Sequence, residues 1–387
     1  MYLANRLKLL MPVITLLLVA ALFPADAMSQ RGTRENIKIP DIRGYLTLKC
    51  DFHMHTVFSD GSVWPTVRVE EAWRDGLDVI AISDHIEYQP HKHDIPTQHN
   101  RPHELAKPSA EASNLILIRG TEITRAIPPG HHNAIFTTDN SLLEVDDFYE
   151  SVKAATDQGA FIFYNHPGWR QPEEKSVWFE QQTENFAKKR LHGIEVVNGG
   201  SYYPLAHQWA IDKKLTMMGT TDVHNPLYFD YDYSVGEHRP MNLVFAKKRT
   251  AESVKDALFA GRTAIWWKNY LIGDEKYLRP IFDETVEVIT SELTITGNGG
   301  ATLQVSNDSC VSYELEIGDS EFVTAPKNVT LSAGRTVRIA LKKKDADVFG
   351  RKKIRLPITV KNLYVLPNTG LEEEITFSMR FEKPAEK

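Results

Sequence analysis

Two histidines separated by one residue, His53 and His55, stand at the end of a strand-like segment. Side chains two residues apart on a strand point to the same face, so we expect both imidazoles on one face of a sheet. Asp60 follows in a Ser-Asp-Gly turn and places a carboxylate nearby. Together, these three residues indicate a metal-binding site, although a His-x-His pair by itself also occurs in ordinary packing.

Further histidines and acids follow later apolar segments of the chain. They occur in five motifs: Ser83-Asp84-His85, Glu122 after Gly120-Thr121, Gly130-His131-His132-Asn133, Asn165-His166-Pro167 and Asp222-Val223-His224. Any one of them has a simple explanation as a cap or a hydrogen-bonded histidine. Gathered in one pocket without cations, they would repel one another or leave buried polar groups unpaired. The series therefore predicts a metal centre.

Strand-like and helix-like segments alternate from residue 44 to residue 274. We expect strands at 46–55, 78–84, 114–124, 131–137, 161–166, 193–198, 216–222 and 241–246. We expect helices at 65–75, 103–113, 145–158, 180–190, 205–214 and 252–261. Repeated units of this kind indicate a parallel sheet covered by helices, and about eight strands suggest a regular or distorted barrel. The strand ends of such a barrel meet at one face, which would bring the motifs together.

The two ends of the chain differ from this pattern. From residue 275 to residue 387 there is little helical periodicity, and short strand-like segments alternate with Gly, Asn, Asp and Pro, which indicates an antiparallel sandwich. Residues 1–27 combine Arg6 and Lys8, an apolar run and the small-x-small Ala25-Asp26-Ala27, which is typical of a secretory signal peptide. An uncleaved anchor is the alternative. Residues 28–43 form a polar N-terminal segment, and we expect an exported protein, periplasmic or secreted.

Composition limits the possible functions. The chain has 387 residues, 42% of them hydrophobic and 25% charged, as in ordinary globular proteins. Its net charge of −6 argues against a general nucleic-acid binder, and no membrane partner is evident. Cys50 and Cys310 fall in different predicted domains, so we expect two separate buried thiols, although export would permit a disulfide.

The ordered motifs between residues 44 and 272 resemble those of the PHP (polymerase and histidinol phosphatase) superfamily. With the signal peptide and the β-rich tail, the chain looks most like secreted phosphodiesterase-type members. The resemblance implies an α/β fold, a distorted (β/α)7 PHP barrel over 44–274, followed by a smaller all-β, Ig-like sandwich domain over 275–387. It also implies up to three metal ions, held by three sets: His53, His55, Glu122 and Asp222; Glu122, His131 and His166; and Asp60, His85 and His224. The neighbouring His132 could substitute for His131, although the His-x-Asn spacing favours His131.

Imidazoles and carboxylates without thiolates suit Mn²⁺, Fe²⁺ or Zn²⁺ better than structural zinc or calcium. We expect two or three divalent ions. A carboxylate shared between two of them would set the pair on the order of 3.5–4 Å apart, and a bridging water would lose a proton near neutral pH. This chemistry predicts a phosphoesterase that hydrolyses small phosphodiesters or phosphomonoesters. The alternatives are an amide or ester hydrolase that attacks carbon, and a surface-binding module with a non-catalytic barrel.

Several other residues lie near the predicted strand ends, and each admits two roles. Arg125 follows the Glu122 strand and could hold a phosphate oxygen or form a surface salt bridge. Tyr164, Trp169 and Asn198 could shape the pocket or simply pack. No single residue stands out as a general acid separate from the metal ligands.

Overall fold

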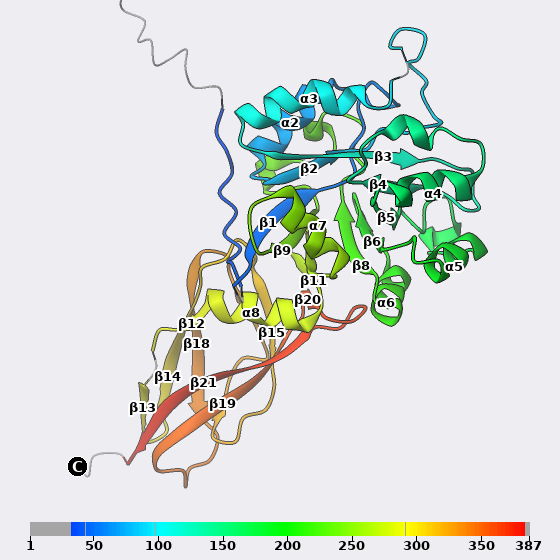
Figure 1. Ribbon diagram of the computed structural model, residues 1–387. Helices are drawn as coiled ribbons and strands as arrows, with labels where there is room; N and C mark the ends of the chain where they lie inside the picture. Colours follow the sequence, from blue (N-terminus) through cyan, green and yellow to red (C-terminus); the bar gives the residue numbers. More distant parts are fainter. Residues whose placement is uncertain (1–31, 43, 97, 291, 384–387) are drawn as a thin grey trace, which may run out of the picture. The chain divides into compact units, whose positions relative to one another are not determined.

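A mixed sheet of twelve strands forms the barrel (Figure 1). The computed structural model describes residues 32–383 except 43, 97 and 291, so the predicted signal peptide lies outside the described residues. The barrel strands are β1 (Leu46–Asp51), β2 (Val79–Ile82), β3 (Ile116–Ile123), β4 (His132–Ile135), β5 (Phe161–Tyr164), β6 (Gly193–Asn198), β7 (Ser201–Tyr202), β8 (Thr216–Thr220), β9 (Met241–Ala246), β10 (Thr263–Trp267), β11 (Tyr270–Gly273) and β20 (Leu363–Tyr364). Eight of them, β1 to β6, β8 and β9, confirm the predicted strands to within a few residues, whereas β7, β10 and β11 were not predicted.

Helices follow most of these strands. They are α2 (Pro65–Arg74), α3 (Arg101–Ala112), α4 (Phe148–Asp157), α5 (Glu180–Ala187), α6 (Pro204–Lys213), α7 (Ala251–Phe259) and α8 (Glu275–Thr285). The first six confirm predicted helices. The expectation of little helix after residue 275 is wrong for α8, which buries Leu278, Ile281 and Phe282 at helical spacing around Pro280. No helix among the described residues has the length and apolar character needed to cross a bilayer.

The sheet is not parallel throughout, which corrects the expectation from the sequence. Strands β1, β2 and β3 are parallel, as are β5, β6 and β8. Strand β4, however, runs antiparallel to both β3 and β5, and β9 runs antiparallel to β1. The connection from β3 to β4 is a short loop, and parallel neighbours need a crossover of a dozen or more residues. Strand β4 therefore begins, rather than ends, at the face where the motifs lie.

A side chain closes the barrel between β8 and β9, which no strand ladder joins. The Asn242 amide donates to the Gly219 carbonyl (2.9 Å) and accepts from the Gly219 amide (3.1 Å). Farther along, the backbone of Asp222 donates to His53 O (2.9 Å), and that of His55 donates to Val223 O (3.0 Å). These backbone hydrogen bonds join the segment that carries His53 and His55 directly to the segment that carries Asp222.

The C-terminal strands form the predicted sandwich, although the strands at residues 292–296 and 371–382 pair in parallel rather than antiparallel. One sheet contains β12 (Val286–Val288), β14 (Gly300–Asn307), β18 (Arg335–Lys343) and β16 (Val323–Thr324). The other contains β13 (Glu292–Thr296), β21 (Leu371–Glu382), β19 (Gly350–Val360), β15 (Tyr313–Ile317) and β17 (Asn328–Leu331). Buried and exposed residues alternate along β19 and β21, as expected for strands with one face in a core.

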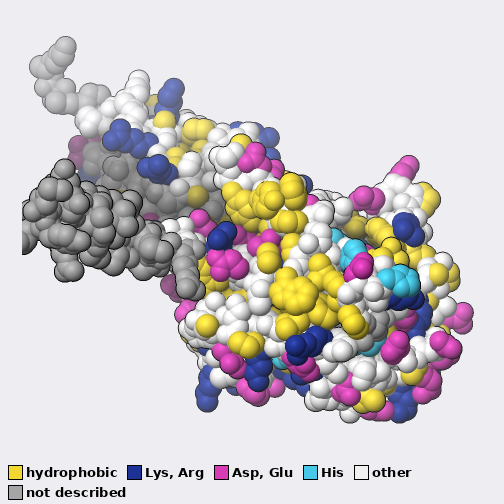
Figure 2. Space-filling view, turned by 90° about the horizontal axis from the view of Figure 1, so that it is seen from above, with side chains coloured by type: hydrophobic (Ala, Val, Ile, Leu, Met, Phe, Trp, Pro, Cys, Tyr) yellow, Lys and Arg dark blue, Asp and Glu magenta, His cyan; other side chains and the backbone are white. Residues whose placement is uncertain are grey.

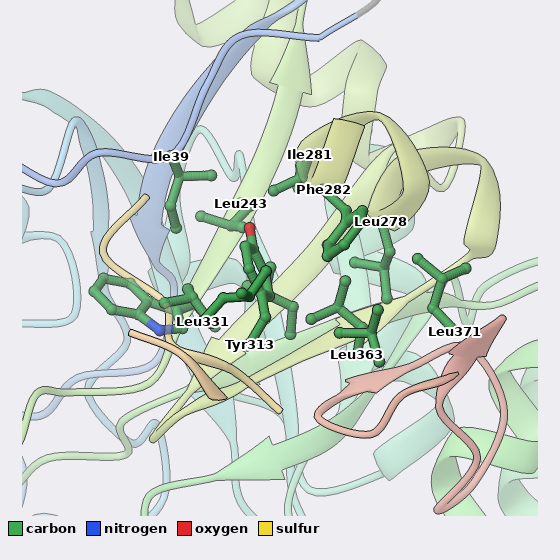
Figure 3. Packing of buried hydrophobic residues seen from close by; sticks show 14 of the residues in the cluster. Ile39, Leu243, Leu278, Ile281, Phe282, Tyr313, Leu331, Leu363 and Leu371 are labelled. Atoms are coloured by element: carbon green, nitrogen blue, oxygen red, sulfur yellow. The ribbon is translucent and has the colours of Figure 1, made fainter. Parts of the chain in front are cut away.

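Barrel and sandwich share one hydrophobic core, shown in Figure 3. Leu243 of β9, Phe282 of α8 and Tyr313 of β15 belong to the same buried cluster. Strand β20 lies between sandwich strands in the sequence, yet it pairs with β11 of the barrel, Leu271 opposite Leu363. Both cysteines are free, as expected; Cys50 is buried and Cys310 is partly buried.

Candidate metal centre

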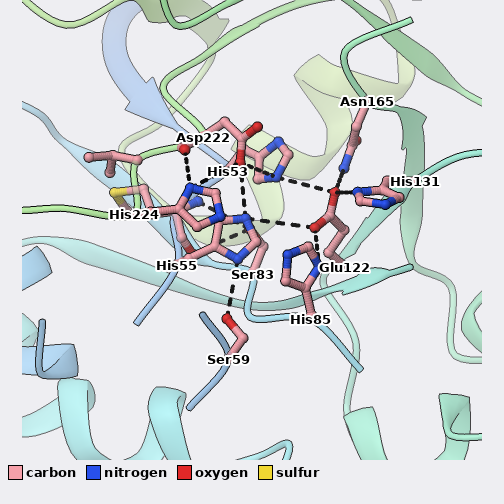
Figure 4. Close-up of polar contacts among 12 residues, drawn as sticks. His53, His55, Ser59, Ser83, His85, Glu122, His131, Asn165, Asp222 and His224 are labelled. Carbon is pink, nitrogen blue, oxygen red and sulfur yellow. Dashed lines mark hydrogen bonds and ion pairs between the residues drawn. The ribbon is translucent and has the colours of Figure 1, made fainter. Parts of the chain in front are cut away.

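The end of β1 and the segment after β8 form the first part of the site (Figure 4). His53 and His55 lie on the same face, as the strand spacing predicts. Asp222 Oδ1 lies 3.1 Å from Nε2 of each of them. All three side chains point at a common space, and Asp222 has a φ of 54°, a strained backbone conformation of a kind that clusters at functional sites.

Glu122, fully buried near the end of β3, lies between several histidines. Its Oε1 is 3.1 Å from His131 Nδ1, 3.4 Å from His53 Nε2 and 3.5 Å from His166 Nε2. Its Oε2 is 2.5 Å from His85 Nδ1. Histidine nitrogens therefore lie close to both oxygens of this carboxylate.

Asp60 gathers the remaining predicted ligands. Its Oδ1 lies 3.2 Å from His224 Nε2, 3.4 Å from His85 Nε2 and 3.7 Å from His55 Nδ1. The structure therefore brings all nine predicted residues together.

The grouping of these residues differs in detail from the expected one. Among the described residues, potential ligand atoms within 4.8 Å of one another form three sets: His53, His55 and Asp222; His85, Glu122 and His131; and His55, Asp60, His85 and His224. His85 and His55 each belong to two sets. His166 contacts Glu122 but belongs to none of them.

The donor atoms fit divalent cations. His53 Nε2, His55 Nε2, Asp60 Oδ1 and Glu122 Oε2 are buried and make no hydrogen bond of proper geometry among the described residues, although each lies within ion-pair distance of another member of the cluster. Leaving such atoms unpaired is costly, whereas imidazole nitrogens and carboxylate oxygens that face a common space can bind a divalent metal. No thiol lies in this set, in keeping with the ion types expected from the sequence.

Charges within the cluster favour the ligand forms of its three carboxylates and of His55, but they raise the pKa of His53, His85, His166 and His224 and so favour the protonated forms of these four. Burial and the neighbouring His224 and His85 lower the pKa of His55 to about 3, so this imidazole is neutral. Burial would raise the pKa of Asp60 and of Glu122, but the surrounding histidines outweigh it and lower both. Burial would lower the pKa of His85, but Glu122 and Asp60 outweigh it and raise the pKa to about 10. Cation binding would therefore release a proton from His85.

The structure separates His131 from His132. His131 contacts Glu122, whereas the His132 ring stacks on Tyr164 (5.1 Å between centroids) and contacts Phe148 (5.0 Å). Burial lowers the pKa of His132 to about 3. His132 is thus a neutral packing residue of β4, and Tyr164 packs with it.

The sequence reasoning missed Glu195, a fully buried residue in the middle of β6. Its Oε1 lies 2.7 Å from His53 Nδ1 and accepts from Thr220 Oγ1 (2.6 Å). Its Oε2 accepts from the His166 amide (2.6 Å) and from Asn198 Nδ2 (2.9 Å). A carboxylate on the second ring nitrogen orients a metal-binding histidine. The available signal was one acid within an otherwise apolar strand.

Two further polar residues hold the ligands in place. Asp84 accepts from the Thr56 amide (2.6 Å) and from Ser59 Oγ (2.7 Å), which fixes the loop that leads to Asp60. Asn165 donates to Glu122 Oε1 (2.6 Å). Both belong to the sequence motifs, but the motifs do not predict these positioning roles.

A cavity of about 910 Å³ opens over the cluster. Its lining includes Asp60, His85, Tyr88, Arg125, His131, His166, Trp169, Arg170, Asp222 and His224. Arg125 forms an ion pair with Glu87 and donates to the Val145 carbonyl (2.7 Å). Its charge is therefore already neutralised where it lines the cavity. In Figure 2, histidine side chains appear on the surface close to hydrophobic groups.

Comparison with known proteins gives a matching assignment. A model described as an Ig-like domain matches residues 286–376. The chain is 42% identical to a two-domain protein from Bacteroides vulgatus that contains a predicted PHP-like metal-dependent phosphoesterase; the match covers 90% of this chain and 100% of that one, with a TM-score of 0.84.

Other comparisons are more distant. A candidate metal-dependent phosphoesterase from Bifidobacterium adolescentis is 19% identical over 46% of this chain and 89% of its own, with a TM-score of 0.35. An amidohydrolase from Chromobacterium violaceum is 14% identical over 46% of this chain and 88% of its own, with a TM-score of 0.34. The comparison with curated proteins finds no match. Because it is 42% identical to the Bacteroides vulgatus protein over 90% of its length, this chain belongs to the PHP-like metal-dependent phosphoesterase family.

Proposed function

We propose that the protein is an exported metal-dependent hydrolase of small phosphodiesters or phosphomonoesters. The observation that supports this most directly is Glu122, a buried carboxylate with histidines at both oxygens beneath an open cavity. We also propose two or three divalent ions (Mn, Fe or Zn), with the nine predicted residues as their ligands. The export part rests on residues 1–27, and the proposed domains are 44–274 and 275–387.

Ions bound here would supply a hydroxide nucleophile near neutral pH and neutralise charge on the phosphoryl oxygens. Other residues of the chain would fix the orientation of the metal-ligand atoms. Glu195 orients the His53 ring, Asn165 hydrogen-bonds Glu122, and Asp84 hydrogen-bonds the loop that leads to Asp60. Such preorganisation means that little rearrangement is needed when charge develops in the transition state. The cavity volume lies in the range of small-molecule sites and favours a small ester over a folded polymer.

A three-substrate assay tests the proposal. The purified protein, loaded with Mn²⁺, is incubated with bis-p-nitrophenyl phosphate, p-nitrophenyl phosphate and p-nitrophenyl acetate, and its metal content is measured by mass spectrometry. We expect turnover of at least one phosphate ester, loss of turnover after chelation, and recovery on adding Mn²⁺. His53→Asn should lose both metal and turnover, whereas His91→Asn, in an exposed loop, should keep both. Hydrolysis of the acetate alone would instead support an amide or ester hydrolase.

A further inference from the structure

Arg170 lines the cavity and pairs with no acidic group among the described residues. Two arginines line the cavity, Arg125 and Arg170. Arg125 is neutralised by Glu87, whereas Arg170 forms no ion pair with any residue that the structure describes. The Arg170 guanidinium carbon lies 4.2 Å from the centroid of the Trp169 ring instead. Its charge is therefore available to a ligand.

The turn that carries Arg170 is tightly built. Trp169 N donates to His166 O (2.9 Å), and Gln171 N donates to Gly168 O (3.0 Å). A Cβ on Gly168 would lie 2.0 Å from the Glu174 carbonyl oxygen, so only glycine fits there. Arg170 has a backbone φ of 56°, in the left-handed region that residues other than glycine rarely adopt. The turn thus fixes the direction in which the arginine leaves the backbone.

Trp169 links Arg170 to the candidate metal centre. Its ring centroid lies 5.1 Å from those of both His131 and His166. The guanidinium covers the tryptophan ring, so the cation lies one aromatic ring away from two proposed ligands. Because Arg170 and the proposed ligands line the same cavity, a substrate whose phosphate lay at the ions could reach this arginine with its organic part.

We propose that Arg170 binds a second anionic group, a carboxylate or a phosphate, on the organic part of the substrate. The planar guanidinium matches both anions through paired N–H donors. This inference rests on the proposed function and narrows its substrate class to phosphate esters that carry a further negative charge. The cavity of about 910 Å³ can hold such a molecule.

The test compares esters of matched shape and different charge. Release of phosphate from 4-carboxyphenyl phosphate, 4-carbamoylphenyl phosphate and 1,4-phenylene bisphosphate is measured with Mn²⁺-loaded wild type, Arg170→Gln and Arg170→Lys. We expect the wild type to prefer either charged ester over the carbamoyl ester by roughly fivefold in kcat/KM. Arg170→Gln should lose this preference while it still turns over the carbamoyl ester, and Arg170→Lys should keep part of it. The relative rates of the two charged esters show which anion fits better.

Arg74→Gln serves as the matched control, because Arg74 is an exposed arginine of α2 that pairs with Glu70. Binding gives a second readout: calorimetric titration with 4-carboxyphenylphosphonate and 4-carbamoylphenylphosphonate should show the same difference. If Arg170→Gln changes both members of each pair equally, or neither, the inference is wrong while the phosphoesterase proposal stands. If the loaded wild type hydrolyses neither these monoesters nor bis-p-nitrophenyl phosphate, the proposed function fails and this inference fails with it; if it hydrolyses only the diester, the phosphonate titrations decide the inference.

Discussion

At the scale of single residues, His53 depends on neighbours on both sides of its ring. Nε2 faces Asp222 and Glu122, and Nδ1 faces the Glu195 carboxylate. A hydrogen bond at one ring nitrogen fixes which nitrogen remains free for a cation.

Replacing Glu195 tests this dependence. In Glu195→Gln the shape remains but the charge opposite Nδ1 is lost, so we expect Mn²⁺ affinity to fall by about 10- to 100-fold. Calorimetric titration of the metal-free protein measures the change. Glu184→Gln, on a partly exposed residue of α5 that pairs with Lys188, is the control and should bind like the wild type. Equal affinities for all three proteins would contradict the positioning role.

The adjacent histidines of β4 provide a second test. His131→Asn removes an imidazole beside Glu122. Because one coordination site then loses a ligand, we expect the metal content to fall by about one ion per chain. His132→Phe replaces a ring that stacks on Tyr164, and we expect unchanged metal content. Mass spectrometry of both variants measures the difference, and metal loss in His132→Phe alone would reverse the assignment.

The gathering of residues at strand ends was predictable from the sequence because strand ends converge, and Glu122, Asp222 and their histidine partners do lie close together. Glu195 was not predictable in this way, because it lies within β6 and reaches the site only through the inward direction of its side chain. The contacts of Arg125 and Arg170 depend on loop shape, which no sequence periodicity encodes.

At the scale of elements, the sequence indicated where strands lie but not the directions of β4 and β9. Local apolar patterns are the same for either direction, and pairing is decided by loops and by distant partners. The contact between β8 and β9 was also not predictable from the sequence. There the Asn242 side-chain amide makes the hydrogen bonds that backbone groups of paired strands would otherwise make.

We expect Asn242→Ala to lower the free energy of unfolding by about 3 kcal/mol, since it leaves the buried amide and carbonyl of Gly219 without partners. Urea titration followed by circular dichroism measures this. Asn328→Ala, on an exposed residue of β17, should change stability little. A loss below about 1 kcal/mol in Asn242→Ala would mean that water replaces the amide between β8 and β9.

At the scale of the whole molecule, the shared core implies that barrel and sandwich unfold together. Leu363 is fully buried between them, whereas Leu366, three residues later, is exposed. We expect Leu363→Ala to cost about 2–5 kcal/mol and to shift a single calorimetric transition to lower temperature. Leu366→Ala should leave the transition in place. Two separate transitions, with only one of them shifted, would show that the domains unfold independently.

The pairing of β20 with β11 also limits how the sandwich could be exchanged. Replacing residues 286–376 with an unrelated Ig-like module would remove Leu363 and Tyr364 from the barrel sheet. The edge of β11 would then offer unpaired backbone groups to other chains, a common route to aggregation. A chimera that transplants this barrel onto another protein should therefore carry a substitute for that short strand.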